Sequence, residues 1–386
     1  MKVYSINFQP IKKERCGNAL IHYIFKTFCQ LEKDEYVFLT SSIDKDYGAN
    51  IIGHSAIVAK IISIFTSIAK ICHVPYYLIR SWNEIIVDYQ HYRYLKKQKE
   101  PYVLVTSMYS RRCTKIAKRK GCKTILIAGN LNDDLYYNAV TNEQKRLGIK
   151  YTDVYSSKYR INIFRAMMSN IDEVWVNSKY SAKTFSDKTT RVIPISYYES
   201  RGYTPKKYEG NHNTNLRIGY FGHTTLLKGV HLLAESVSKS NYKDSITLVL
   251  VGSIDKYVSE LLSRSDAKIE YLGYIKEEEK ESIIKSFDLM AVPSLYDAGP
   301  TTIYEGCECN VPMLVSSGCG GSELIQDNKG CLIFNTMDID DLTNKIDYFY
   351  ENRDIFEKTG SYMSNKFGKS NDQTNFDILK SALKKQ

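Results

Sequence analysis

Residues 289–317 read LMAVPSLYDAGPTTIYEGCECNVPMLVSS, and the order of patterns within them sets the architecture of the second half of the chain. A short apolar run at 289–294 ends at a Pro-Ser pair and predicts a buried strand. Gly-Pro at 299–300 breaks the chain, and the pattern at 301–309 predicts a short helix. A second apolar run follows at 313–317. Strand, loop, helix and strand in this order form one βαβ unit of a parallel sheet.

The rest of the second half repeats this alternation of apolar runs with amphipathic helical patterns. Such alternation is typical of a parallel sheet that is covered by helices on both faces. Strands are predicted at 216–222, 246–252, 268–275, 289–294, 313–317 and 331–335, and helices at 228–239, 255–264, 277–287, 301–309 and after Asp338.

The first half shows the same alternation of strand and helix patterns. Strands are predicted at 2–8, 36–42, 102–107, 124–129, 172–178 and 191–196, and helices near 18–31, 55–72, 80–98, 109–120 and 156–169. The stretch 196–215 is polar and lacks periodicity, so it predicts a linker.

The predicted fold class is α/β, with two doubly wound, Rossmann-like domains that face a central cleft. The first domain is expected at 1–197, the linker at 198–214 and the second domain at 215–365. Residues 366–386 are expected to form a C-terminal helix that packs back on the first domain. Ligands of such sheets bind beyond the carboxyl ends of the strands, so the loops after strands are the places to look for chemistry.

The composition is that of an ordinary globular protein. Apolar residues make up 43% of the 386, and the N-terminal MKVYSINFQP predicts a strand rather than a signal peptide. No charge-free apolar run reaches the length of about 18 residues that a membrane-spanning helix needs. The nine cysteines lack the spacing of a disulfide framework, which favours reduced thiols and a cytoplasmic location.

Charge is unevenly distributed along the chain. Residues 1–200 contain 31 Lys and Arg against 17 Asp and Glu, a net charge of +14, whereas residues 201–386 have a net charge of −4. An anionic membrane surface, a lipid-linked phosphate or a nucleic acid would fit the basic half, and lysines that are simply solvated are the alternative. Because no nucleic-acid-binding motif is present, a nucleic acid is not expected as a partner.

Residues 55–80, SAIVAKIISIFTSIAKICHVPYYLIR, are mainly apolar, with lysines at 60 and 70, and residues 111–123 are basic. The apolar segment has two interpretations. It is either a helix that faces the core or an interfacial helix that seats the protein on an anionic membrane, peripheral to the cytoplasmic face.

Two loops of the second half suit an anionic ligand. GHTTLLKGVHLL opens a predicted helix near Lys228, and Thr301 or Thr302 can cap the next such helix; backbone N–H groups at helix starts attract anions. The loops follow adjacent strands, so together they suit a diphosphate. Asp297 lies before the second helix and Glu305 one turn inside it, where carboxylates can accept hydrogen bonds from the hydroxyls of a ribose or a hexose.

These segments resemble the C-terminal domain of retaining GT-B glycosyltransferases of the family 4 type. PSLYDAGPTTIYEGCECNVPMLVSSGCGGSELI, with FGHTTLLKGVHLL upstream, is similar to the Glu-x7-Glu segment and the diphosphate-binding Arg/Lys loop of those enzymes. The resemblance covers about 215–335. In the first half, DEVWVNSKYSAKTF resembles their D-x-V-x-x-x-S strand and helix.

The resemblance implies roles for the matching residues. Glu305 would hold the ribose hydroxyls of a nucleotide sugar, and Asp297 would contact the transferred sugar. Lys228 would neutralise the diphosphate leaving group, so Asp297 and Lys228 are the catalytic candidates. The other donor-binding candidates are Gly17, His223, Gly252, Tyr274, Ile275, Gly299, Pro300, Thr301 and Thr302.

Several positions depart from the family pattern. Asp297 replaces a glutamate and is one methylene shorter, and His223 replaces an arginine and is charged only part of the time near pH 7. A single Gly17 replaces a pair of glycines. Asn130 stands where the family often has a histidine, and Asn130 and the nearby Asp133 are the acceptor-side candidates.

The implied function is transfer of a hexose from a UDP- or GDP-linked donor to a glycan or lipid-linked saccharide, with retention of anomeric configuration. Neither a cofactor nor a metal is expected, because Lys228 and helix N-termini would replace a divalent cation. Four cysteines of the second half are predicted on a helix and on strands, which disfavours a zinc site. Two alternatives stay open: a sugar-nucleotide epimerase of the same architecture, and a degenerate, non-catalytic sugar-nucleotide binder.

Overall fold

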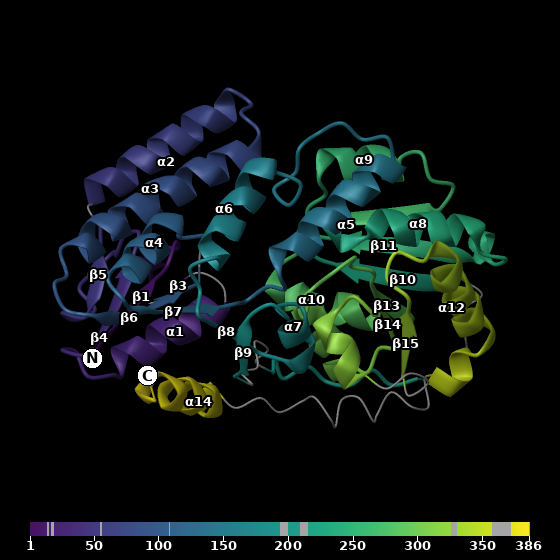
Figure 1. Cartoon of the computed structure of the whole chain (residues 1–386). Helices are drawn as coiled ribbons and strands as arrows, with labels where there is room; N and C mark the ends of the chain where they lie inside the picture. The colour runs from purple at the N-terminus through teal and green to yellow at the C-terminus, as the bar shows by residue number, and fades with distance from the viewer. Residues whose placement is uncertain are drawn as a thin grey trace. The chain divides into compact units, whose positions relative to one another are not determined.

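The computed structural model describes residues 1–386 except 14, 17–18, 55, 108, 194–199, 209–214, 326–329, 357–371 and 386. The chain divides into two compact units, Met1–Tyr197 with Asn371–Gln386 as the first and Tyr198–Ser370 as the second. Each unit has one parallel sheet with helices on its faces (Figure 1). The predicted α/β class with two Rossmann-like domains is confirmed.

The sheet of the first unit has seven strands, all parallel to their neighbours. They are β1 (Lys2–Ile6), β4 (Tyr36–Thr40), β5 (Ile51–Gly53), β6 (Tyr102–Thr106), β7 (Lys123–Ile127), β8 (Glu173–Val176) and β9 (Thr189–Val192). Their order is β5-β4-β1-β6-β7-β8-β9. The chain therefore starts in the middle, runs outward to β5, returns to β6 and runs outward to β9. This is the doubly wound arrangement, with its switch point between β1 and β6.

Alternate residues of these strands enter different cores. Val3 and Phe38 face one side, where α1 (Ala19–Cys29) and α14 (Asp372–Lys384) pack together. Tyr4 and Leu39 face the other side. Successive side chains of each strand thus point to opposite faces of the sheet, and both faces are apolar because each packs against other parts of the unit.

The remaining helices of the first unit follow the strands in turn. α2 lies outside α3 in Figure 1, and α4 packs against both α3 and α6. Their bounds are α2 (Ala56–Ile71), α3 (Tyr76–Lys96), α4 (Arg111–Arg119), α5 (Asp133–Arg146), α6 (Lys158–Met168) and α7 (Lys179–Lys183).

The sheet of the second unit has six parallel strands in the order β12-β11-β10-β13-β14-β15, with the switch point between β10 and β13. They are β10 (Leu216–Phe221), β11 (Ile246–Val251), β12 (Lys268–Gly273), β13 (Leu289–Val292), β14 (Met313–Ser316) and β15 (Cys331–Phe334). The helices are α8 (Val230–Lys239), α9 (Lys256–Leu262), α10 (Glu277–Lys285), α11 (Thr301–Glu308) and α12 (Ile339–Glu351). α8 packs against α12, whereas α10 and α11 contribute to the core on the other face through Ile284 and Ile303.

β5, the antiparallel pair β2 (Ile11–Lys12) and β3 (Arg15–Cys16), and the helix α5 are absent from the predictions above. The three strands are two or three residues long, too short to show alternation. α5 did have a signal, because the side chain of Asn132 accepts a hydrogen bond from the backbone N–H of Asp134 at 3.0 Å. Asn followed by two aspartates is the pattern of a helix start.

The described part of the predicted linker, residues 200–208, binds to the second unit. The carboxylate of Glu308 accepts hydrogen bonds from the Ser200 hydroxyl at 2.5 Å and from the N–H groups of Gly202 and Tyr203 at 2.8 and 3.2 Å. This polar segment therefore donates its hydrogen bonds to one specific carboxylate. The rest of the predicted linker lies outside the described residues.

Within the described ranges, no helix is both long enough and apolar enough to cross a membrane. The nine cysteines are free thiols, and seven of them are buried. Burial raises the pKa of Cys16 to about 12, so its thiol stays protonated at neutral pH.

Candidate functional site

The loops that follow β10 and β13 lie next to each other because the two strands are neighbours in the sheet. The backbone N–H of Leu295 donates to the carbonyl of Leu227 at 2.9 Å and ties the loops together. The hydroxyl of Thr336 donates to the carbonyl of Leu295 at 2.6 Å and holds the second loop from the other side. The predicted adjacency of the two loops is confirmed.

Lys228 does not lie in the first turn of a helix as predicted. It ends a 3-10 turn, Leu226–Lys228, and α8 begins only at Val230. Gly229 separates the two with a φ of 67°. A Cβ at this position would lie 1.9 Å from the carbonyl oxygen of Pro293, so both the backbone angle and the close approach require glycine. The prediction failed because this contact with the neighbouring loop redirects the chain.

Lys228 and Asp297 form an ion pair across the two loops, in which the ammonium donates to Oδ2 of the carboxylate. The backbone of Asp297 is held on both sides, since its N–H donates to Gly318 at 3.0 Å and its carbonyl accepts from Gly320 at 2.8 Å. A carboxylate fixed in this way needs little reorganisation when a ligand arrives. An anion that binds Lys228 would have to share this ammonium with Asp297.

The amino end of α11 belongs to the same loop. Pro300 is the N-cap residue, and no side chain among the described residues caps the helix. The prediction that Thr301 or Thr302 is the cap is therefore wrong: the extended backbone of Pro300, with φ −67° and ψ 125°, already starts the helix one residue earlier. The N–H groups of the first turn are the ones that a phosphate oxygen can accept from.

The carboxylate of Glu305 is buried, and its partner is a lysine that the sequence patterns did not single out. Nζ of Lys280, on α10, lies 2.6 Å from Oε1 of Glu305. Oε2 is buried and lacks a hydrogen-bond partner among the described residues. A buried oxygen without a partner needs an explanation, and a ligand hydroxyl, a water or an ion that completes the site is such an explanation. The sequence analysis did not select Lys280 because charged residues occur along the whole of α10, as is usual for a surface helix. Only the fold brings Lys280 against α11.

The loop after β11 lies beside the loop after β10. Nδ1 of His223 is 2.5 Å from the hydroxyl of Ser253. Gly252 has a φ of 115°, and a Cβ there would lie 2.3 Å from the carbonyl oxygen of Gly222. After β12, Ile275 packs against the core of the unit, whereas Tyr274 is 84% exposed. The structure thus brings His223 and Gly252 together and leaves the ring of Tyr274 in solvent.

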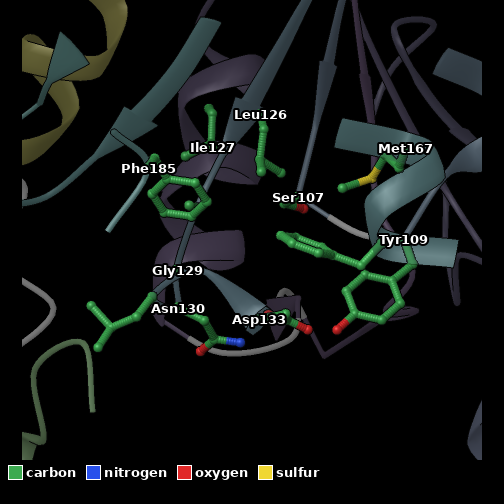
Figure 2. A pocket seen from close by; sticks show the side chains of 12 residues that line it. Ser107, Tyr109, Leu126, Ile127, Gly129, Asn130, Asp133, Met167 and Phe185 are labelled. Atoms are coloured by element: carbon green, nitrogen blue, oxygen red, sulfur yellow. The ribbon is translucent and has the colours of Figure 1, made fainter. Parts of the chain in front are cut away.

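The first unit contains a pocket beyond β6 and β7, and both acceptor-side candidates line it (Figure 2). In this view the carboxyl group of Asp133 lies between the side chains of Asn130 and Tyr109. Ser107 and Phe185 are among the other lining residues. The remaining candidate of this unit, Gly17, lies outside the described residues.

Asp133 is buried at the start of α5, and its burial raises the pKa to about 7, although the positive charge of Arg160 lowers it in part. Arg160 is itself held by Glu84 at 3.0 Å and lies over the ring of Tyr109, with 4.6 Å between Cζ and the ring centre. Asp133 therefore changes protonation state near neutral pH. A carboxyl group poised in this way suits proton transfer or hydroxyl binding.

Over the part of the chain that the structure describes, no group of three or more His, Cys, Asp or Glu side chains is placed to hold a metal ion.

Residues 205–366 match the family described as Glycosyl transferases group 1. We refer to them below as the group 1 domain. This domain contains every residue of the second unit discussed above except those of the 200–204 segment. The match supports a glycosyltransferase.

Two relatives are uncharacterized glycosyltransferases of Methanocaldococcus jannaschii. MJ1178 is 24% identical over 198 residues, 51% of this chain and 55% of that protein. MJ1607 is 27% identical over 185 residues, 46% of this chain and 47% of that protein. The chain thus spans about half the length of the curated relatives that it matches.

The structures of known proteins agree with the GT-B fold over the whole chain. Sucrose-phosphate synthase from Thermosynechococcus elongatus is 14% identical, with a TM-score of 0.63 over 100% of this chain and 99% of that chain. Anabaena HepE, solved in complex with UDP and glucose, is 16% identical, with a TM-score of 0.56 over 100% of both chains. At these identities the likeness concerns the fold, and function has to be argued from the site.

Proposed function

We propose that this protein transfers a hexosyl group from a UDP- or GDP-linked donor to a glycan or lipid-linked saccharide, with retention of anomeric configuration and without a metal ion. The observation that carries the proposal is the convergence of three features at adjacent strand ends of the group 1 domain. These are the Lys228 ammonium, the amino end of α11, and the buried carboxylate of Glu305 with one unpartnered oxygen. HepE, which shares the fold, was solved with UDP and glucose.

The proposed division of labour follows the chemistry of each group. Glu305 accepts hydrogen bonds from the vicinal hydroxyls of the ribose, and Asp297 from a hydroxyl of the sugar. Lys228 and the N–H groups of Thr301 and Thr302 bind the diphosphate. Gly299, His223, Gly252, Tyr274 and Ile275 complete the donor site.

In the proposed reaction, the bond between the anomeric carbon and the phosphate oxygen breaks and its electron pair stays on the phosphate. The acceptor hydroxyl oxygen bonds to the same face of that carbon, and its proton leaves with the departing phosphate. Negative charge grows on the diphosphate during this step. Lys228 and the amino end of α11 offset that charge, which is the work that a divalent cation would otherwise do.

Calorimetric titration of the full chain with UDP, GDP and ADP tests the proposal. We expect one base series to bind and the corresponding sugar nucleotide to release free nucleotide only when an acceptor is present. If no nucleotide binds, the proposal is overturned. Interconversion of the donor sugar without an acceptor would favour the epimerase, and binding without turnover on any acceptor would favour the non-catalytic binder.

We assign acceptor binding to the pocket of the first unit, through Asn130 and Asp133. The ionised carboxylate of Asp133 would accept a hydrogen bond from an acceptor hydroxyl other than the attacking one and so position the acceptor, and the acceptor kcat/KM of the wild type should therefore rise with pH through about 7. Asp133→Asn should lower this kcat/KM by about 10- to 100-fold and remove the rise. The same variant should bind UDP or GDP as the wild type does. An unchanged pH profile would exclude this role.

We further propose that α2 seats the protein on an anionic membrane, where a lipid-linked acceptor would be found. Its exposed apolar side chains are Ile61, Ile64, Phe65, Ile68 and Ile71. No acidic residue occurs between positions 54 and 83, whereas Lys60, Lys70 and Arg80 do. An exposed apolar helix face with lysines on the same helix is complementary to a surface of anionic lipids.

The double variant Ile64→Glu/Ile68→Glu should reduce binding to phosphatidylglycerol-containing vesicles by about 30-fold or more, because it removes apolar area and adds like charge. Co-sedimentation with vesicles measures this. The matched control is Ile355→Glu, an exposed isoleucine of the group 1 domain, which should bind as the wild type does. Equal binding of the double variant, or wild-type binding that does not depend on phosphatidylglycerol, would contradict the proposal.

A further inference from the structure

The carboxylate of Glu305 is almost completely enclosed, with 2% of its side chain exposed. Burial of a carboxylate favours its neutral form unless a charge or hydrogen bonds compensate it. A neutral carboxyl group is a weaker acceptor for ribose hydroxyls than a carboxylate is. The donor site that we propose therefore needs a positively charged partner for this buried side chain.

Two titratable groups, the phenol of Tyr203 and the thiol of Cys309 at the end of α11, interact with Glu305 without supplying positive charge. Burial raises the pKa of the Tyr203 phenol well above its ordinary value, with further contributions from Glu305 and Glu277, while Arg201 lowers it. Burial raises the pKa of the Cys309 thiol to about 12. Both groups are neutral at neutral pH, so neither compensates the carboxylate.

Two other charged side chains on α10 and α11 are engaged elsewhere. Glu308 accepts from the 200–203 segment, and Lys285 pairs with Glu281 at 2.6 Å. Lys280 is then the cation, among the described residues, that contacts the Glu305 carboxylate. Its own side chain is only 16% exposed, so water screens the pair weakly.

We propose that Lys280 is a positioning residue of the donor site. It holds Oε1 of Glu305, compensates the charge of the carboxylate, and leaves Oε2 available for the ribose hydroxyls of a nucleoside diphosphate. Phe221 supports the lysine, since Nζ lies 5.4 Å from the centre of its ring. The inference rests on the proposed function, because it assigns the partner of a carboxylate that the proposed donor site uses.

The test is calorimetry with UDP, and with GDP if the wild type selects guanine. Lys280→Met should raise the ratio of variant to wild-type Kd to about 10–100, because the Glu305 carboxylate loses the charge partner that holds Oε1. Lys280→Arg should restore wild-type affinity. Lys285→Met, on the same helix, is the matched control and should bind as the wild type does.

A second measurement separates a structural effect from this role. In the background of Glu305→Gln there is no charge to compensate, so Lys280→Met should add nothing to the Kd. Failure of Lys280→Arg to restore affinity, or full additivity of Lys280→Met and Glu305→Gln, would overturn the inference. If the wild type binds no nucleotide, the proposed function fails first. If the wild type binds and Lys280→Met binds equally well, only the role of Lys280 fails.

Discussion

Glu305→Gln is expected to weaken binding of the cognate nucleoside diphosphate by about 30- to 100-fold, the largest loss of affinity that we expect from a single substitution. Hydrogen bonds to a charged acceptor contribute about 1.5–3 kcal/mol each, and the substitution keeps the shape of the side chain while it removes the charge. Calorimetric titration of the purified variant measures the change in Kd. The thermal unfolding temperature of the variant, measured without ligand, reports whether it is folded.

The ligand provides the control for this prediction. A dideoxy nucleotide that lacks both ribose hydroxyls should bind the wild type and Glu305→Gln about equally, because the carboxylate then has nothing to accept from. A loss of the same size for the dideoxy nucleotide would mean that Glu305 acts through the structure of α11. A Kd within threefold of the wild type for the natural nucleotide would remove Glu305 from the donor site.

Lys228→Met is expected to lower kcat by about 100- to 1000-fold with a smaller effect on the KM of the donor, the magnitude typical of removing one group that stabilises developing charge. The ammonium interacts most strongly with the diphosphate when the sugar–phosphate bond is breaking. Steady-state kinetics with the donor identified by calorimetry measures both constants. Lys239→Met, on the exposed side of α8, should change neither.

Asp297 tests the same arrangement from the other side of the ion pair. Asp297→Ala should lose turnover more than affinity, and with Lys228→Met it should be non-additive, because the two side chains contact each other. If Asp297→Ala and Glu305→Ala lost nucleotide affinity equally, the assignment of one acid to the sugar and the other to the ribose would be contradicted.

The local sequence pattern was sufficient to predict most of the strands and helices. The apolar runs at 216–222 and 289–294 became β10 and β13, because short β-branched runs between helical patterns have few alternatives to a buried parallel strand. The adjacency of the loops after these strands followed from the doubly wound order. Asp297, Glu305 and Lys228 could be selected from the sequence because each lies in the loop or helix that directly follows a predicted strand.

Contacts between segments that are distant in sequence decided the details of the site. Gly229 ends the turn at Lys228 because the carbonyl of Pro293 lies against it, 64 positions along the chain. The segment that reads as a linker is held by Glu308, about 100 residues away. Neither contact produces a periodic sequence pattern from which it could be predicted.

The sequence by itself determined the two-domain α/β architecture and the pair of acids in the group 1 domain, since hydrophobic period and turn chemistry are local properties. The tertiary structure alone decided which cation meets each acid. Lys228 meets Asp297 and Lys280 meets Glu305, although many other lysines are equally charged. The physical reason is that an ion pair depends on separation in space and on exclusion of water, and both are set only when α10, α11 and the two loops pack together.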